Sequence, residues 1–374
     1  MKKKKILIFG LTSLIGGVET YIINLVRNID KEKFEINFLV QEEIAGINKE
    51  KINGYFNKMY IVENLKRHPI KALKTLKRLY LHEKFDVIHL NISTASSALY
   101  ALPSKIYSKE TKIIVHSHNG GDKNKLQHYV FRSILNKITD QYLSCSKLAA
   151  DWMFGKKIVS SNRVIITNNA IETDKFIFDE EIRNKKRKEL GLKENDFIIG
   201  HVGRFNEQKN HIQMLEILNP ILSKSDNIKL ILIGTGELEE QVKNKVKSMK
   251  INNKVIFLGP KKNVSEYYQV MDLFILPSIF EGLPIVGIEA QASGLKCIFS
   301  DNITKEVDIT SNSIFISISD QEKWRKTIYA IKEKGYIRKN ERSKIIENGY
   351  DLKKEINKIE EIYLKTSGGT NENK

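Results

Sequence analysis

Short aliphatic runs alternate with longer amphipathic segments along this chain, in two successive sets. Near-continuous runs of Val, Ile and Leu indicate strands buried on both faces, and the helical spacers indicate crossover connections between parallel strands. The first set comprises 5–10, 35–40, 86–91, 112–117 and 141–146, and the second comprises 197–203, 228–234, 254–259, 273–278 and 296–301. We therefore predict an α/β protein with two domains, each built on a parallel sheet.

A highly charged stretch without a strand pattern separates the two sets. It includes EEIRNKKRKELGLKEND, where the rise in charge and the loss of the strand rhythm indicate a linker near residues 178–190, although Leu190 and Gly191 could close a short helix there. We expect an N-terminal domain over 1–178 and a C-terminal domain over 185–349. Residues 350–366 form an amphipathic helical pattern, and the polar tail 367–374 is typical of a disordered segment. The apolar stripe of that helix comprises Leu352, Ile356, Ile359, Ile362 and Tyr363.

The net charge of +17 is concentrated in the first half of the chain. Residues 1–178 hold 29 Lys and Arg against 16 Asp and Glu, whereas residues 179–374 hold 33 against 29. This asymmetry favours an anionic partner, which is a nucleic acid, an anionic membrane surface or a phosphorylated substrate. No nucleic-acid-binding module and no interleaving of basic and aromatic residues is visible, so we expect no nucleic-acid partner.

The sequence gives no support for a disulfide framework, a thiolate metal site or a membrane span. Cys145 and Cys297 lie far apart in apolar surroundings, as is typical of proteins of a reducing cytosol. The basic N-terminus precedes a hydrophobic stretch, as in a secretory signal, but Gly10, Gly16 and Gly17 interrupt that stretch. We interpret it as a buried first strand and a glycine loop, and no other segment is long and apolar enough to span a bilayer.

The glycine loop is a candidate anion site. Gly16 and Gly17 lie between the first strand and an amphipathic helix that we expect to begin near Val18. Glycines let a ligand approach the backbone, and a helix N-terminus offers free N–H groups to an anion. The spacing is not G-x-G-x-x-G, which disfavours a nicotinamide cofactor. An ordinary strand-to-helix turn is the alternative interpretation.

A second candidate anion site follows the strand at 197–203. In GHVGRFNEQKNH, Arg204 and Lys209 lie five residues apart on a polar loop. Arg can bind a diphosphate through two hydrogen bonds and Lys can bind it as a point charge. Ligands of open α/β sheets bind at the carboxyl ends of strands, where this loop begins. A solvated loop without a ligand is the alternative.

Two glutamates lie eight residues apart in SIFEGLPIVGIEA. Glu281 falls in a loop after a strand, and Pro284 suits the first turn of the following helix, where its missing N–H costs nothing. Glu289 then lies more than one turn inside an apolar helix, where a buried carboxylate needs a partner. Both carboxylates are candidate ligand groups. The alternatives are a capping role for Glu281 and a surface position for Glu289.

Four motifs, in this order and spacing, resemble those of the retaining glycosyltransferases of family 4, in particular those that build bacterial exopolysaccharides and capsules. They are GGVE (16–19), GRFNEQK (203–209), VIFLG (255–259) and LPSIFEGLPIVGIEAQASGLKCIFSD (276–301). The resemblance spans nearly the whole chain. It implies the GT-B architecture, which is an α/β fold of two Rossmann-like lobes with parallel sheets and a C-terminal helix that crosses back to the N-terminal lobe. It also implies that the N-terminal lobe binds the acceptor and the C-terminal lobe the nucleotide sugar.

The resemblance assigns roles to the candidate residues. Arg204 and Lys209 match the pair that binds the donor diphosphate and stabilises its departure. Glu281 matches the carboxylate at the hydroxyls of the transferred sugar, and Glu289 matches the carboxylate that accepts hydrogen bonds from the ribose. Backbone N–H groups within 283–285 would meet sugar and phosphate oxygens, and the backbone of Leu258 would read the edge of the base. The other implied donor-binding residues are Gly16, Gly17, Gly282, Leu283, Pro284 and Ile285.

Two histidines end the strand in VHSHNGG. His118 matches a histidine of the N-terminal lobe that lies near the sugar and the reacting centre. We expect His116 to point the other way by strand alternation and to be structural. The sequence departs from the family at 164–176, where VIITNNAIETDKF lacks the usual Pro-Asn-Gly before the Ile. This departure bears on the geometry of that turn more than on the activity.

The resemblance implies catalysis without a metal ion. The anomeric carbon gains positive charge as the nucleoside diphosphate leaves, and Arg204, Lys209 and a helix dipole stabilise that leaving group. We expect no cofactor beyond the nucleotide sugar, which is a UDP-hexose or UDP-N-acetylhexosamine. Retention without a covalent nucleophile implies attack on the same face, with neither glutamate as nucleophile, unlike the carboxylates of retaining glycosidases.

The implied acceptor is a lipid-linked or soluble glycan, and a polyprenyl-diphosphate-linked glycan is the expected form. That acceptor places the protein in the cytoplasm, peripheral to the inner face of the plasma membrane. A nucleotide-sugar epimerase of similar two-lobe architecture is the alternative enzyme, which the Glu281 and Glu289 spacing disfavours. The sequence leaves open which sugar and base the donor carries and which linkage forms.

A basic amphipathic helix is predicted over 66–84. In KRHPIKALKTLKRLYLHEK the apolar residues recur at helical spacing and the basic residues fall on another face. Such a helix suits an anionic membrane surface. The alternative is an ordinary helix whose apolar stripe is core and whose lysines are solvated. The apolar stripe comprises Ile70, Leu73, Leu76 and Leu79, and the basic face comprises Lys71, Lys74, Lys77 and Arg78.

Overall fold

The computed structural model describes residues 2–14, 16–118 and 125–368, and the chain divides into two compact units. Unit 1 comprises Met1–Ala170 and Leu352–Lys374, and unit 2 comprises Ile171–Asp351. The division after Ala170 lies earlier than the boundary expected at 178. Residues following Ala170 belong to unit 2 because Ile171 and Phe176 are buried in its core.

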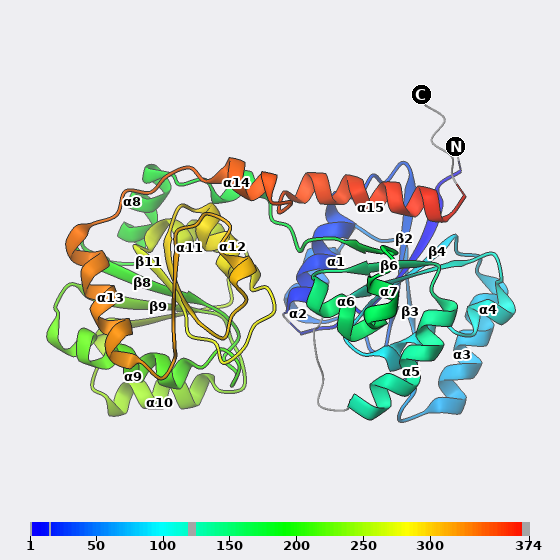
Figure 1. The fold of residues 1–374 in the computed structure, drawn as a ribbon, viewed down its shortest axis with the longest axis horizontal. Helices are drawn as coiled ribbons and strands as arrows, with labels where there is room; N and C mark the ends of the chain where they lie inside the picture. The colour runs from blue at the N-terminus through cyan, green and yellow to red at the C-terminus, as the bar shows by residue number, and fades with distance from the viewer. Residues whose placement is uncertain (1, 15, 119–124, 369–374) are drawn as a thin grey trace. The chain divides into compact units, whose positions relative to one another are not determined.

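Unit 1 is built on a seven-stranded sheet in which every neighbouring pair is parallel (Figure 1). The strand order is β3-β2-β1-β4-β5-β6-β7, the order of a Rossmann fold with one added edge strand. The strands are β1 (Lys4–Phe9), β2 (Phe34–Val40), β3 (Lys58–Ile61), β4 (Val87–Ile92), β5 (Lys112–Ser117), β6 (Gln141–Ser144) and β7 (Val164–Ile166).

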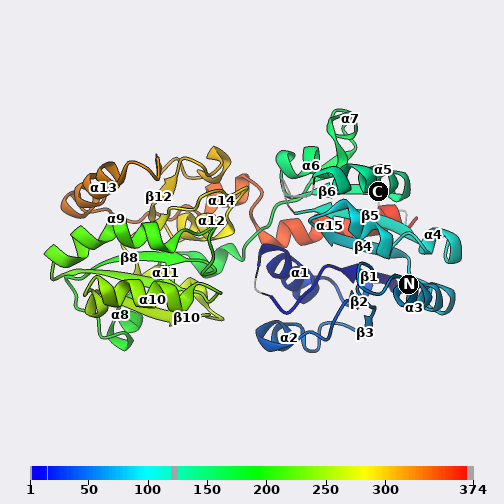
Figure 2. The ribbon, with the colours of Figure 1, turned by 90° about the horizontal axis from the view of Figure 1, so that it is seen from below.

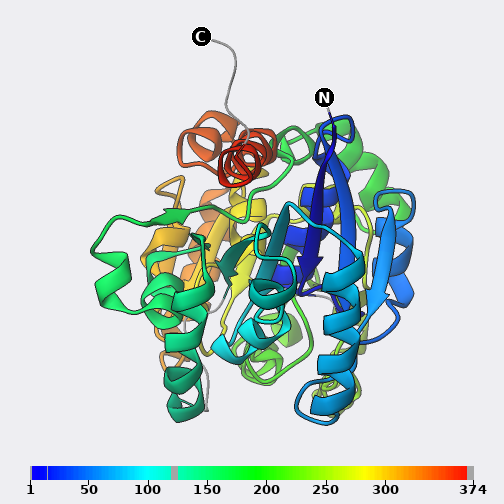
Figure 3. The same cartoon turned by 90° about the vertical axis from the view of Figure 1, so that its right-hand side faces the viewer.

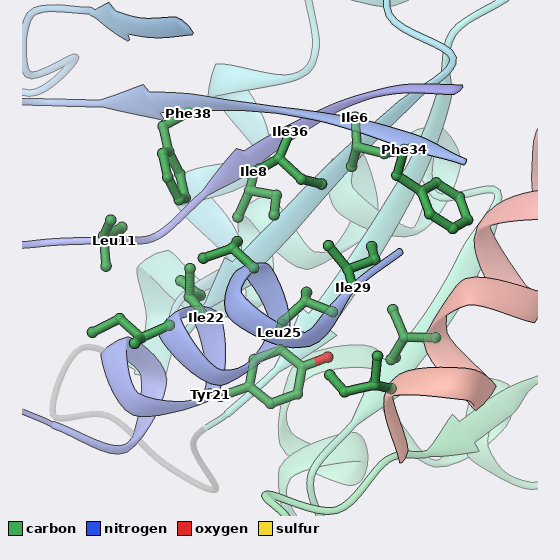
Figure 4. Packing of buried hydrophobic residues seen from close by; sticks show 14 of the residues in the cluster. Ile6, Ile8, Leu11, Tyr21, Ile22, Leu25, Ile29, Phe34, Ile36 and Phe38 are labelled. Atoms are coloured by element: carbon green, nitrogen blue, oxygen red, sulfur yellow. The ribbon is translucent and has the colours of Figure 1, made fainter. Parts of the chain in front are cut away.

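Helices cover both faces of this sheet, so alternate residues of each central strand are buried on opposite sides. Ile6 and Ile8 of β1 pack with α1, as Figure 4 shows, whereas Leu7 and Phe9 belong to the core of the other face. The first face is covered by α1 (Gly17–Asn28), α2 (Gly46–Ile52) and α15 (Leu352–Thr366). The second is covered by α3 (Pro69–His82), η1 (Ala95–Tyr100), α4 (Ser104–Tyr107), α5 (Lys125–Ile138) and α6 (Lys147–Phe154), and α7 (Lys156–Val159) follows α6.

Unit 2 repeats this plan with a six-stranded parallel sheet of order β10-β9-β8-β11-β12-β13. Its strands are β8 (Phe197–Val202), β9 (Ile228–Ile233), β10 (Val255–Gly259), β11 (Leu273–Leu276), β12 (Lys296–Ser300) and β13 (Ser313–Ile316). Figure 2 shows helices on both sides of it. One face packs α9 (His211–Lys224), α10 (Glu239–Ser248) and α13 (Gln321–Lys334). The other packs α11 (Val264–Val270), α12 (Ile285–Ala292) and α14 (Arg342–Glu347), and the short 3-10 turns are η2 (Thr173–Phe176), η3 (Asn252–Lys254) and η4 (Lys305–Val307).

The charged stretch where we placed the linker contains the helix α8 (Glu180–Glu189), which ends at Leu190 and Gly191 as the sequence allowed. Arg183 donates to the carbonyl oxygens of Gln269, Val270 and Met271 at the end of α11 and lies 2.5 Å from the carboxylate of Asp272. The guanidinium of Arg183 therefore donates to the last carbonyl oxygens of α11, which have no hydrogen-bond partner within that helix. Local charge density could not reveal this, because the partners lie far along the chain.

The C-terminal helix α15 packs on unit 1, as the family resemblance implies. All five residues of its predicted stripe are buried, and they join the same core as α1. Residues 369–374, most of the tail that we expected to be disordered, lie outside the described residues. Among the described residues, no helix has both the length and the hydrophobicity needed to cross a bilayer.

Candidate functional site

Two loops meet at the carboxyl edge of the sheet in unit 2. The loop after β8 is joined to the loop after β11 by Gln208, whose carbonyl oxygen accepts from the backbone N–H of Ile279 at 2.8 Å. The Gln208 amide donates to the carbonyl oxygen of Phe280, and Asn210 donates to that of Pro277, both at 3.1 Å. These bonds fix the two predicted ligand loops relative to each other.

Lys209 and Glu281 form an ion pair across these two loops. The Lys209 Nζ lies 2.6 Å from the Glu281 Oε1, and both side chains are largely buried, with 14% and 11% of their surface exposed. The Ser278 hydroxyl donates to the same carboxylate oxygen at 3.1 Å. The stem of Lys209 lies against Gly203, where a Cβ atom would come within 3.1 Å of its Cδ. The helix that follows, α12, has no side-chain cap, so Glu281 does not cap it, which was the alternative interpretation.

Arg204 lies on the same loop and pairs with a different carboxylate. Its Nε and one terminal nitrogen each lie 3.1 Å from Glu237, and both side chains are about half exposed. Glu237 follows β9 in a loop that packs closely on the backbone after β8. A Cβ atom at Gly234 would lie 2.0 Å from the Gly203 carbonyl oxygen, and one at Gly236 would lie 2.5 Å from that of Phe205. Only glycine permits this approach.

Glu289 accepts a hydrogen bond from the hydroxyl of Tyr268 at 2.8 Å. Tyr268 is fully buried on α11, and burial first, followed by the charge of Glu289, raises the pKa of its hydroxyl. Glu289 lies in the second turn of α12 as predicted, and it is partly buried and not on the surface. Pro284 is the residue before the helix and not its first residue, a difference of one position.

The backbone of Leu258 lies at an irregularity of the edge strand β10. The register with β9 shifts between Phe257 and Gly259, so that two residues of β10 oppose one residue of β9. At such a bulge, one extra residue is left out of the regular ladder of hydrogen bonds between the strands. Gly282 is exposed, and Leu283 and Ile285 are partly buried at the start of α12.

In unit 1, the glycine loop leads into α1, which begins at Gly17, close to the predicted start. Glu19 folds back over this helix end: a Cβ atom at Gly16 would lie 2.7 Å from its Oε2, and its Oε1 accepts from the Thr12 hydroxyl at 2.5 Å. The carboxylate of Glu19 thus lies at the positive end of the α1 dipole. Asn48 holds the loop by donating to the carbonyl oxygens of Thr12 and Leu14.

His118 follows β5 at the carboxyl edge of the unit 1 sheet. Its Nε2 lies 3.0 Å from the Oδ1 of Asn91, and burial lowers the pKa of its imidazole to about 3. The expectation that His116 points the other way is wrong, since the two rings lie 4.0 Å apart. Residues separated by two positions in a strand share a face. His116 is buried and bonds to the Thr167 hydroxyl, as a structural residue would.

The predicted basic helix is α3, and its apolar stripe divides into two parts. Leu76 and Leu79 are buried in the core, whereas Ile70 is 72% exposed and Leu73 is 48% exposed. Figure 3 views this face of unit 1, with α3 in blue. Helices of a parallel α/β sheet run opposite to its strands, so the start of α3 lies toward the carboxyl edge that carries His118. The four basic residues at 71, 74, 77 and 78 are all exposed.

The structure brings only some of the predicted residues into contact. Lys209 and Glu281 form an ion pair. Arg204 pairs with Glu237, Glu289 bonds to Tyr268, and Leu258 lies on the edge strand β10. Sequence reasoning missed the supporting residues Ser278, Glu237, Tyr268, Gln208 and Asn210. A signal for the Glu237 loop was present, because GTGE follows an aliphatic strand directly at 234–237.

Within the described residues, no group of three or more His, Cys, Asp and Glu could hold a metal ion.

Comparisons with known proteins agree with both halves of this description. Residues 15–175 match the family model described as Glycosyltransferase Family 4, and residues 182–352 match the model described as Glycosyl transferases group 1. The chain is 27% identical to the protein EpsF of Bacillus subtilis over 359 residues, which cover 93% of each chain. It is 25% identical to the UDP-Gal:alpha-D-GlcNAc-diphosphoundecaprenol alpha-1,3-galactosyltransferase of Escherichia coli, with 97% of each chain covered.

Solved structures share the fold. A glycosyltransferase from Rickettsia africae superposes with a TM-score of 0.78 at 17% identity, over 99% of this chain and 100% of the other. HepE of Anabaena, solved with UDP and glucose, superposes with a TM-score of 0.72 at 14% identity, over 98% and 97%. The predicted GT-B architecture, with two Rossmann-like lobes, is confirmed.

Proposed function

Because the chain belongs to the two-lobed glycosyltransferases of group 1 and family 4, we propose that it transfers a hexosyl or N-acetylhexosaminyl group from a UDP-sugar to a glycan acceptor. The E. coli relative is named for a UDP-galactose donor, and HepE was solved with UDP-glucose. These names support a UDP-sugar donor and leave the sugar itself open.

The observation that carries this proposal is the contact between Lys209 and Glu281 at the carboxyl edge of unit 2. A cation for the diphosphate and a carboxylate for sugar hydroxyls must lie side by side where those two parts of the donor join. Arg204 adds a second cation on the same loop, and α12 begins four residues after Glu281 with free N–H groups. Glu289 then receives the ribose hydroxyls while Tyr268 holds its other oxygen in place.

The proposed reaction retains the anomeric configuration and uses no metal ion. The bond from the anomeric carbon to the diphosphate oxygen breaks while Arg204, Lys209 and the start of α12 stabilise the charge on the leaving UDP. The acceptor oxygen attacks the same face, and its proton passes to the departing phosphate oxygen. Glu281 binds hydroxyls in this scheme and does not attack. A glycosyl ester trapped on Glu281 and detected by mass spectrometry would disprove this part of the proposal.

We further propose that the acceptor is a glycan linked to a polyprenyl diphosphate and that the transfer serves exopolysaccharide or capsule biosynthesis. Two relatives are named for diphosphoundecaprenol acceptors, which carry negative charge at a membrane surface. The exposed basic and apolar residues at the start of α3 suit the cytoplasmic face of an anionic membrane. Peripheral attachment there would bring the acceptor-binding lobe to its substrate.

The test is a screen of nucleotide sugars in which the protein is heated with each compound. A specific donor raises the melting temperature by mass action, because it binds only the folded protein. The best donor is then incubated with and without a polyprenyl-diphosphate glycan. UDP release that depends strictly on the acceptor supports a transferase, whereas conversion of the sugar without any acceptor indicates an epimerase.

A further inference from the structure

Three histidines of unit 1 lie in a file across its sheet. His89 on β4 and His116 on β5 stack with ring centroids 5.6 Å apart, and His118 follows 4.0 Å from His116. Burial lowers the pKa of His89 and of His118 to about 3, and it also lowers the pKa of His116. All three rings are therefore neutral near pH 7, and each carries its proton on one of two nitrogens.

The side chain of Asn91 faces the tip of His118. Its Oδ1 lies 3.0 Å from the His118 Nε2, and its Nδ2 donates to the carbonyl oxygen of Phe9 at 3.4 Å. Turning the amide over would set Oδ1 against that carbonyl oxygen, so that two acceptors would face each other. The amide oxygen must therefore face His118. Because an amide oxygen only accepts, the His118 Nε2 must carry the proton.

Asn91 has little freedom to leave this position. It is 2% exposed, and the chain just after β1 passes so close that a Cβ atom at Gly10 would lie 2.2 Å from the Asn91 carbonyl oxygen and 3.0 Å from its Cβ. Gly10 also has a φ of 116°, a conformation that other residues rarely adopt. Close packing after β1 thus fixes the backbone of Asn91, and burial together with the bonds to Phe9 and His118 holds its amide.

We propose that Asn91 is a positioning residue that holds His118 as the Nε2–H tautomer, so that His118 serves the transfer as a fixed neutral ring and not as a proton acceptor. The role in transfer rests on the proposed function, whereas the tautomer does not. The Nε2 of His118 already donates to Asn91, and its Nδ1 is buried without a hydrogen-bond partner among the described residues. A proton leaving the acceptor has no accessible site on this ring, which agrees with its transfer to phosphate.

The groups around His118 also favour the neutral form. A proton on its ring would place positive charge beside His116 and near His89, both buried. The ring of Tyr21 from α1 lies 5.0 Å away, and burial, with a smaller contribution from Glu355 of α15, raises the pKa of its hydroxyl, so Tyr21 stays uncharged. In the described part of the chain, no carboxylate forms a salt bridge with His118 that would stabilise an imidazolium.

Nitrogen-15 NMR of the unliganded protein tests the tautomer without any need for activity. His118→Gln identifies the His118 signals by their disappearance. We expect one protonated Nε2 and one unprotonated Nδ1 at pH 7, unchanged down to pH 5. Asn91→Asp keeps the acceptor but adds a charge that favours imidazolium, so the ring should titrate between about pH 6 and 8. A wild-type Nδ1–H tautomer, or an imidazolium at pH 7, would overturn the proposal.

The pH dependence of kcat/KM tests the consequence for transfer. For Asn91→Asp, kcat/KM should change with pH between about pH 6 and 8, as the ring titrates. Asn91→Leu should lower kcat/KM about tenfold without adding such a pH-dependent change. The matched control is Asn37→Asp, which buries a carboxylate on β2 away from the three histidines. It should add no pH-dependent change in kcat/KM. A profile of Asn91→Asp identical to wild type contradicts the positioning role. Absence of any sugar transfer by the wild type contradicts the proposed function and leaves the NMR result standing.

Discussion

The Nζ of Lys209 and the Oε1 of Glu281 lie 2.6 Å apart although 72 positions separate them in the chain. In the unliganded protein, these two groups neutralise each other. Under the proposed function, a bound donor would give each group a new partner, since the diphosphate would attract Lys209 and the sugar hydroxyls would donate to Glu281. The ion pair therefore holds both side chains in place until the donor replaces each partner.

Replacing either member should have different effects on donor binding. Lys209→Ala removes the cation, so we expect UDP affinity to fall about tenfold and kcat to fall about 10²- to 10³-fold. Glu281→Gln frees Lys209, so UDP should bind at least as tightly as to wild type while kcat falls about 10²-fold. Calorimetric titration of UDP and steady-state kinetics measure both. Lys245→Ala, which removes a pair with Glu216 2.9 Å away, is the control and should change neither. Equal loss of UDP affinity in both site variants would contradict the assignment.

Glu289 should discriminate ribose from deoxyribose. In the wild type we expect UDP to bind about tenfold more tightly than 2′,3′-dideoxy-UDP. The dideoxy ligand has no ribose hydroxyls to donate hydrogen bonds to the Glu289 carboxylate. Glu289→Gln should shrink that ratio toward one. Tyr268→Phe should shrink it by a smaller factor, because it removes only the hydrogen bond that orients the carboxylate. If the ratio measured for Glu289→Gln equals that of the wild type, the ribose is bound elsewhere.

The exposed start of α3 should contribute to membrane binding. Replacing Ile70 and Leu73 together with Ser removes the apolar groups that would enter the headgroup region, so binding should weaken about tenfold or more. Sedimentation with vesicles containing phosphatidylglycerol measures this, and neutral phosphatidylcholine vesicles should bind little of either protein. Leu81→Ser is the control, because Leu81 is 51% exposed at the other end of the same helix. Equal binding to both kinds of vesicle would rule out an anionic-membrane contact.

Buried neutral histidines should make the fold sensitive to acid. The folded-state pKa is lowered to about 3 for His89 and His118 and to about 4 for His211, whereas in the unfolded chain it is ~6.5. The unfolded state therefore binds more protons below about pH 6.5, and stability present above that pH is lost as the pH falls toward the folded values. Each histidine contributes a slope of up to about 1.4 kcal/mol per pH unit.

Urea unfolding at several pH values measures that slope. His211→Phe should reduce it by about one proton, because neither ring nitrogen of His211 has a partner among the described residues and its ring stacks on Phe205. The control is His82→Gln, a substitution at an exposed histidine. A free energy of unfolding that does not change between pH 7.5 and 5 would contradict the neutral state of these buried rings.

Much of the fold follows from short-range patterns in the sequence. The strands could be predicted because both of their faces are covered, which leaves uninterrupted aliphatic runs such as KILIFG. The α15 stripe could be predicted because one helical face is buried. By contrast, the packing of α8 could not be predicted, because the partners of Arg183, which are carbonyl oxygens at the end of α11, lie more than 80 positions away.

The site was predictable in its residue types and less so in its contacts. Arg204, Lys209, Glu281 and Glu289 stand out because polar groups follow apolar strands or interrupt an apolar helix. The pairing of Lys209 with Glu281 and not with Glu237 depends on loop packing around Gly203 and Gly234 that no local pattern encodes. The periodicity of α3 predicts a single apolar face, but of its four residues only Leu76 and Leu79 are buried in the core.

The most direct test of the central claim is to follow transfer from the donor found in the screen to a polyprenyl-diphosphate glycan and to determine the anomeric configuration of the product by proton NMR. We predict an acceptor-dependent product with the configuration of the donor sugar, formed by the wild type and by Lys245→Ala and almost absent with Lys209→Ala. A product of inverted configuration, or equal transfer by Lys209→Ala, would contradict the account.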